Sequence, residues 1–83
     1  MNKILVRIKC PLISQEYEMF LPLNKTIGKV TKLVQKAIID LNVEMIPNKE
    51  TAVLIKPDNN EILDPEKIVM DSNIKNGDTL VLF

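Results

Sequence analysis

Apolar residues recur at steps of three and one position between residues 23 and 43, in the middle of the chain. They are Ile27, Val30, Leu33, Val34, Ala37, Ile38 and Leu41. Residues at this spacing share one face of an α-helix, so the pattern predicts an amphipathic helix. Thr26 can cap its N-terminus with a side-chain hydroxyl, and Asn42 suits its C-terminal end. Gly28 is unfavourable in the first turn, which a close approach to a neighbouring loop would explain.

Before the helix, apolar and polar residues alternate instead. The alternation predicts one strand over residues 3–10 and a second over residues 16–21, each with one buried face. The expected buried residues are Ile4, Val6, Ile8 and Cys10 in the first strand and Tyr17, Met19 and Leu21 in the second. Pro11 ends the first strand, and the short link after it makes the pair a β-hairpin.

After the helix, the sequence predicts three shorter strands separated by turn residues. The strands are expected at residues 52–56, 61–63 and 79–83. Turns are expected at residues 57–60 and 76–78, with a short helical or 3₁₀ turn at residues 64–68.

One helix and one sheet, each with a single apolar face, pack most economically when the helix lies across the sheet. The first and last strands are then expected to pair in parallel at the centre. We therefore predict an α+β fold, a mixed four- to five-stranded sheet with one long helix packed across it. The chain has 83 residues, so residues 1–83 are expected to form a single domain.

Composition and charge narrow the possible functions. Apolar residues make up 46% of the chain and charged residues 27%, as in an ordinary globular domain. The net charge is zero, which argues against a globally basic nucleic-acid binder. No apolar run is long enough to cross a membrane, no signal-peptide pattern opens the chain, and Cys10 has no second cysteine to pair with. These features predict a cytoplasmic protein without direct membrane insertion.

The order of the elements, together with several local sequences, resembles ubiquitin and its β-grasp relatives. Those sequences are the hairpin-to-helix step between Leu21 and Ile27, the Met45, Ile46 and Pro47 segment after the helix, and the ending at residues 74–82. Within this superfamily the chain looks most like the small YukD/EsaB-type proteins encoded with Gram-positive type VII (ESX-like) secretion systems. The resemblance implies a β-grasp fold and a bacterial accessory or regulatory component of such a system, acting by protein–protein interaction.

The sequence departs from the conjugating and sulfur-carrying members of that superfamily at their Gly-Gly tail. It reads Leu82 and Phe83 there, within the predicted last strand, and its only glycines are Gly28 and Gly77. Glycine suits such a tail because a segment without side chains can enter a narrow active site. We therefore expect a non-conjugating module, with a ubiquitin-like modifier or a sulfur-carrier-type protein as the alternative.

Few residues are candidates for catalysis or metal binding. The chain has no His, the most common general base near neutral pH, and a lone Cys cannot form a Cys–His pair. Cys10 has the inward parity of its strand and is expected in the core. The neighbouring acids Glu16 and Glu18 fit a solvated strand face, and residues 58–61 fit a turn better than a calcium loop. We predict no enzymatic activity, no cofactor and no metal.

If the helix covers one face of the sheet, strand parity leaves apolar residues, with basic residues at their rim, on the opposite face. That candidate partner-binding set is Leu5, Arg7, Phe20, Leu54, Lys56, Val81 and Phe83. Val53 and Ile55 are expected to face the helix. An apolar patch with a basic edge is typical of a surface that binds a protein. Scattered exposed apolar side chains and weak self-association through the patch are the alternatives.

Lysines line the expected solvent side of the helix. They are Lys25, Lys29, Lys32 and Lys36. Such a row is either an ordinary solvated face or a basic stripe for an acidic partner or anionic lipid.

Overall fold

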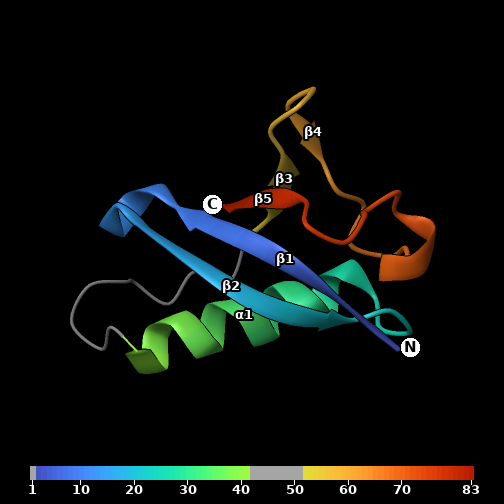
Figure 1. Cartoon of the computed structure of the whole chain (residues 1–83), viewed down its shortest axis with the longest axis horizontal. Helices are drawn as coiled ribbons and strands as arrows, with labels where there is room; N and C mark the ends of the chain where they lie inside the picture. Colours follow the sequence, from blue (N-terminus) through green and yellow to red (C-terminus); the bar gives the residue numbers. More distant parts are fainter. Residues whose placement is uncertain (1, 42–51) are drawn as a thin grey trace.

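The computed structural model describes residues 2–41 and 52–83 (Figure 1). Two expectations lie outside these residues: the helix end at Asn42 and the ubiquitin-like segment from Met45 to Pro47. The described elements are β1 (Lys3–Cys10), the 3₁₀ helix η1 (Pro11–Ile13), β2 (Gln15–Pro22), α1 (Ile27–Leu41), β3 (Leu54–Lys56), β4 (Glu61–Ile62), the 3₁₀ helix η2 (Val69–Asp71) and β5 (Thr79–Leu82).

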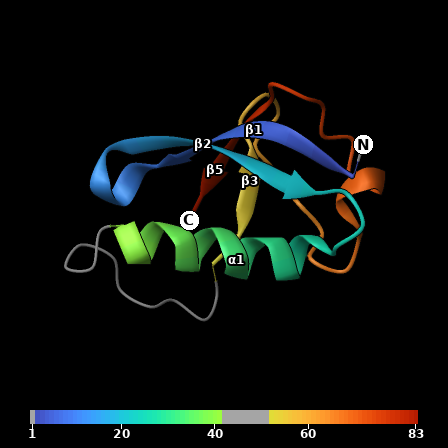
Figure 2. The ribbon, with the colours of Figure 1, turned by 60° about the horizontal axis from the view of Figure 1, so that its bottom comes forward.

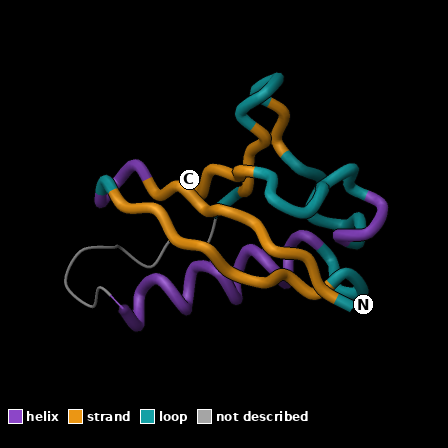
Figure 3. Tube along the Cα trace, in the orientation of Figure 1, coloured by secondary structure: helices purple, strands orange, loops and turns teal. Residues whose placement is uncertain are grey.

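The strands form one mixed sheet in the order β2-β1-β5-β3-β4. The central strands β1 and β5 run parallel, and each of the other neighbouring pairs is antiparallel. Figure 2 shows α1 running along a single side of this sheet, and Figure 3 shows the β1–β2 hairpin lying nearest to it. The predicted α+β architecture is confirmed, including the parallel pairing of the first and last strands.

The β1–β2 hairpin follows the predicted alternation. Its register is unbroken from Lys3 opposite Pro22 to Cys10 opposite Gln15. After η1, the chain turns through Ser14, whose φ of 52° lies in the left-handed region. The buried side chains are Val6, Ile8, Cys10 and Leu21, with Ile4, Tyr17 and Met19 partly buried against them. Because successive side chains point to opposite faces, the remaining residues of both strands point away from α1.

The buried stripe of α1 differs from the predicted one. Its apolar members are Ile27, Val30, Val34 and Ile38, and the polar residues Thr31 and Gln35 are buried with them. Leu33, Ala37 and Leu41 are exposed instead. The Thr31 hydroxyl donates a hydrogen bond to the carbonyl oxygen of Ile27 at 2.7 Å, which satisfies this buried polar group within the helix.

The N-terminus of α1 is joined to the segment that follows β4. The first two amides of the helix, those of Ile27 and Gly28, donate to the carbonyl oxygens of Lys67 (2.8 Å) and Pro65 (2.9 Å). The next two amides donate to Thr26, Lys29 to the side-chain hydroxyl at 3.2 Å and Val30 to the carbonyl at 3.0 Å. All four amides that a helix start leaves without partners are thus bonded, and the predicted Thr26 cap is confirmed.

The predicted helical turn after β4 lies later in the chain than expected. Residues 64–67 form a turn in which the Lys67 amide donates to the Asp64 carbonyl at 3.2 Å. The 3₁₀ helix is instead η2, at Val69–Asp71. The carbonyls of Pro65 and Lys67 are used by the start of α1, which explains why this stretch remains open. The predicted turn at residues 76–78 is confirmed, with Gly77 at a φ of 90°.

Gly28 occupies the point of closest approach between α1 and this segment, as the sequence predicted. A Cβ at position 28 would lie 3.1 Å from the Pro65 carbonyl oxygen and 3.4 Å from the Pro65 Cβ. Both are held in place, because the same carbonyl accepts the Gly28 amide and the proline ring is rigid.

We therefore expect Gly28→Val to lower the free energy of unfolding by about 1–3 kcal/mol, the usual cost of overpacking. Thermal denaturation followed by circular dichroism measures this change. Lys29→Val, one position along on the exposed side, is the matched control, because it introduces the same β-branched side chain without meeting Pro65. Equal losses in the two variants would contradict a close contact at Gly28.

Candidate partner-binding surface

The inner and outer faces of the C-terminal half of the sheet are set by the pairing of β3. Leu54 lies opposite Leu82, and Ile55 lies opposite Val81 on β5 and Ile62 on β4. Leu54 and Leu82 are both buried in the core. Since neighbouring residues on a strand alternate between faces, Ile55, Val81 and Ile62 share the outer face.

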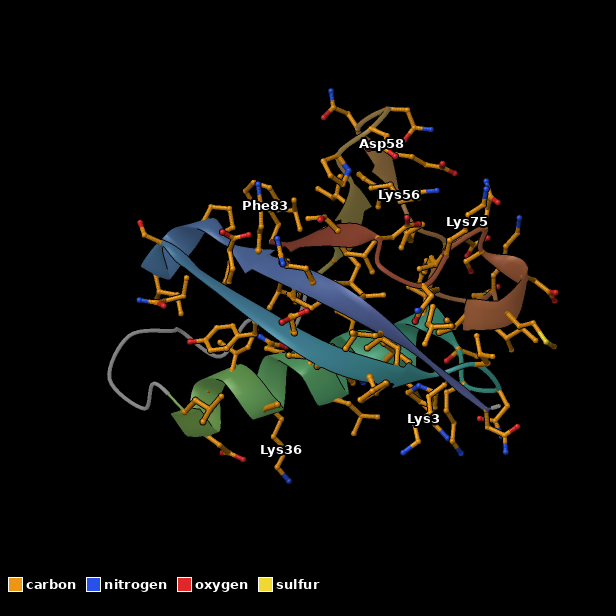
Figure 4. All side chains as sticks on the ribbon, in the orientation of Figure 1. Lys3, Lys36, Lys56, Asp58, Lys75 and Phe83 are labelled. Carbon is orange, nitrogen blue, oxygen red and sulfur yellow. The ribbon has the colours of Figure 1, made fainter. Side chains whose placement is uncertain are left out.

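Apolar side chains gather there over three neighbouring strands. We define the outer apolar patch as Val53, Ile55, Ile62, Val81 and Phe83. Val53 and Phe83 close its end by exchanging two backbone hydrogen bonds, each of 2.9 Å. Ile62 is 61% exposed and Phe83 49% exposed, and the other three are partly exposed. In Figure 4, Phe83 stands on the opposite side of the molecule from Lys36 on α1.

Basic side chains on β1 border this patch. Lys9 lies beside Val81 on one side and opposite Glu16 on the other, so one row across the outer face reads Glu16, Lys9, Val81, Ile55, Ile62. In the next row, Arg7 lies beside Thr79 and opposite Glu18. Lys9 and Arg7 are both exposed. The apolar centre is therefore flanked by positive charge on its β1 side.

A smaller apolar pair lies at the far end of the β1–β2 hairpin. Leu5 pairs with Phe20, which is 60% exposed, and the Lys3 Nζ stands 5.8 Å from the centroid of the Phe20 ring. That distance is within reach of a cation–π interaction. The charged rows of Arg7 and Lys9 separate this pair from the outer apolar patch. The predicted surface is thus divided into two parts.

Two residues of the predicted surface do not lie on it. Leu54 is 0% exposed and belongs to the core beneath α1, so its placement on the outer face is wrong. Lys56 has the same parity as Leu54, and its Nζ donates to the Asn73 carbonyl oxygen at 2.9 Å instead of bordering the patch. The physical reason is a shift of one residue in parity along β3. The same shift places Val53 and Ile55 outward, where they were expected inward.

The other candidate residues lie as follows. Cys10 is buried in the core, as predicted, and Glu16 and Glu18 are exposed on β2. The tip at residues 57–60 is the predicted turn, in which the Glu61 amide donates to the Asn59 side chain at 3.2 Å. Lys25, Lys29, Lys32 and Lys36 are all exposed.

Residues 2–41 and 52–83 contain no group of three or more side chains placed to hold a metal ion. Within the same described part, no helix is long and apolar enough to span a bilayer. The predicted absence of enzymatic activity stays a prediction.

No protein-family model and no curated protein matches the sequence. Solved structures do match the fold. A chain of the MycP5-free ESX-5 inner membrane complex, State II, aligns with a TM-score of 0.81 at 15% identity over 100% of this chain and 21% of that one. The present chain thus spans about a fifth of that protein.

Two further matches span most of both chains. The ubiquitin-like domain of the Mycobacterium tuberculosis type VII secretion system protein EccD1 aligns with a TM-score of 0.75 at 12% identity, over 99% of this chain and 98% of that domain. A chain of the toluene 4-monooxygenase HD complex with the inhibitor 4-bromobenzoate aligns with a TM-score of 0.81 at 12% identity, over 96% and 95%. At these identities the likeness concerns the fold, which is the ubiquitin-like β-grasp fold that the sequence predicted.

The corrected parity of β3 is tested by a pair of substitutions. We expect Leu54→Glu to prevent folding, because it places a carboxylate in the core without a partner. We expect Ile62→Glu, on the exposed side of the same hairpin, to change the free energy of unfolding by less than about 1 kcal/mol. Far-ultraviolet circular dichroism and thermal denaturation measure both. A folded Leu54→Glu variant together with an unfolded Ile62→Glu variant would contradict the assignment of faces.

Proposed function

We propose that the chain is a non-conjugating ubiquitin-like interaction module, which docks through its outer apolar patch on a protein component of a type VII secretion system. In this proposal it is a cytoplasmic accessory or regulatory component, of the kind represented by the YukD/EsaB-type proteins. The likeness in fold to the EccD1 ubiquitin-like domain and to a chain of the ESX-5 complex supports the secretion context.

The outer apolar patch is the observation that carries the proposal. Its five apolar side chains lie on or directly next to three adjacent strands. They therefore form one continuous apolar area rather than isolated exposed residues. No element within the described residues covers it, because α1 occupies the other face of the sheet. Contiguous exposed apolar area rimmed by polar groups is characteristic of protein-binding surfaces.

The charges beside the patch indicate the chemistry of the partner. Lys9 and Arg7 are exposed on its β1 side, whereas the patch itself contains no charge. A complementary surface would present apolar side chains at its centre and carboxylates where it meets β1. Such charges at the rim contribute to orientation and to the rate of association, and burial of the apolar centre supplies most of the affinity.

We expect Ile62→Asp and Val81→Asp to leave the domain folded and to abolish capture of the partner. The measurement is affinity purification of the tagged chain from its native cells, followed by mass spectrometry. Type VII components should be enriched with the original chain, and denaturation should release them because the complex is non-covalent. Met70→Asp is the matched control, since Met70 is 62% exposed but lies in η2, away from the patch.

Three outcomes would contradict the proposal. Undiminished capture by the folded Ile62→Asp and Val81→Asp variants would exclude the outer apolar patch as the docking surface. Captured proteins without any type VII component would refute the secretion context. Adducts that survive denaturation would indicate a conjugated modifier.

A further inference from the structure

The side of α1 that faces away from the sheet is a second exposed surface. It carries Lys29, Lys32 and Lys36, which are all exposed. At 100° per residue these three side chains fall within an arc of about 60°, and at 1.5 Å per residue they span about 10 Å along the helix axis. We call them the lysine row. Lys25, which is also exposed, precedes the helix by two residues.

The charges of the lysine row are not neutralised within the described part of the chain. No carboxylate of residues 2–41 or 52–83 forms an ion pair with these lysines. Asp40, the acidic residue of α1, follows Lys36 by four positions without pairing with it. The lysines are three and four residues apart, so they lie side by side on the helix and repel one another. An anionic ligand would relieve this repulsion.

Charge is distributed unevenly over the whole molecule. Residues 2–41 hold seven basic and three acidic side chains, a net charge of +4, whereas residues 52–83 hold three basic and six acidic ones, a net charge of −3. Figure 4 shows Lys36 pointing away from the sheet and Asp58 on the opposite side of the molecule. An anionic surface would attract the α1 side and repel the β3–β4 hairpin, so this distribution orients the chain toward it.

The composition of the lysine row indicates which anionic ligand fits. Protein interfaces are depleted in lysine and depend on buried aromatic or arginine anchors, which the row lacks. Backbone groups in the middle of a helix bond within the helix, so they offer an acidic peptide no further hydrogen bonds. A bilayer requires neither feature, because anionic headgroups present negative charge over a wide, flat area. The row therefore favours a lipid surface over an acidic protein segment.

Leu33 adds an apolar contact beside the lysine row. It lies four residues after Lys29 and three before Lys36, so it neighbours both on the helix surface. It is 57% exposed. On a bilayer, lysine stems and an adjacent leucine can enter the boundary between headgroups and acyl chains while the ammonium groups stay among the phosphates. Such attachment is peripheral and needs no membrane-spanning helix.

We propose that the lysine row and Leu33 bind α1 to the surface of a bilayer that contains anionic phospholipids. Each lysine near such a surface strengthens binding about fivefold, so the attachment is weak, reversible and sensitive to salt. In this orientation Phe83 and the outer apolar patch point away from the lipid and stay open to a protein. The two surfaces share no residue, so failure of this proposal would leave the function proposed above standing.

The experiment is cosedimentation of the whole chain with vesicles of phosphatidylglycerol and phosphatidylcholine. Vesicles of phosphatidylcholine alone are the lipid control. We expect binding to the anionic vesicles only, and we expect it to fall as salt is added. Lys32→Gln combined with Lys36→Gln should lower the partition coefficient about 25-fold, fivefold for each lysine. Lys9→Gln combined with Lys75→Gln makes the same change in net charge away from α1 and should leave the coefficient nearly unchanged.

A spin label on the lipid headgroup reports which face meets the bilayer. We expect it to broaden the nuclear magnetic resonance signals of Lys29, Leu33 and Lys36 and to leave those of Ile62 and Phe83 sharp. The proposal is overturned if the anionic vesicles do not bind, if neutral vesicles bind equally well, if both pairs of substitutions weaken binding equally, or if the label broadens the outer apolar patch instead. Tighter binding to a polyglutamate peptide than to the vesicles, at equal concentration of negative charge, would also overturn it, because it would assign the row to an acidic protein segment.

Discussion

Burial of a single row of side chains between α1 and the sheet determines the rest of the molecule. Ile8, Leu80 and Leu54 are 0% exposed on the inner faces of three strands, and Ile27 and Val34 meet that layer from the helix. Each such side chain contributes about 1.5–3 kcal/mol when it leaves water. Because successive side chains on a strand point to opposite faces, each residue buried under the helix places its two neighbours on the outer face. The core thereby creates the outer apolar patch.

A second constraint orients the helix on that layer. The segment after β4 crosses the start of α1 and accepts its first two amides, so the helix cannot slide along the sheet without breaking these bonds. Gly28 allows the backbones to approach closely at this point. The link joins the N-terminal hairpin and helix to the C-terminal strands.

The sequence predicted those elements whose local pattern is unambiguous. The alternation in β1 and β2 determined both position and facing, and Thr26 correctly marked the start of α1. The residues of β3 were assigned to the wrong faces of the sheet because Val53, Leu54 and Ile55 are all apolar. Without alternating apolar and polar residues, the sequence does not show which of them point inward. The parity of β3 is set by the pairing of Leu54 with Leu82, a contact between distant parts of the chain. Leu82 is buried on the inner face of β5, so this register places Leu54 inward as well.

The helix illustrates a related limit. Leu33, Ala37 and Leu41 fit an apolar stripe by spacing, yet the core takes Thr31 and Gln35 instead. The Thr31 hydroxyl is satisfied by its own helix, so its burial costs less than its polarity suggests. Which flank of a broad apolar stripe is buried depends on where the sheet lies, and spacing alone does not contain that information.

Cross-linking inside the cell tests the central claim, that the outer apolar patch meets a protein partner, most directly. A photo-reactive phenylalanine analogue at the position of Val81 would report on the patch, and the same group at Lys36 would report on the far side of the molecule. We expect a cross-link from position 81 to a type VII component and none from position 36. A cross-link from position 36 alone would contradict it.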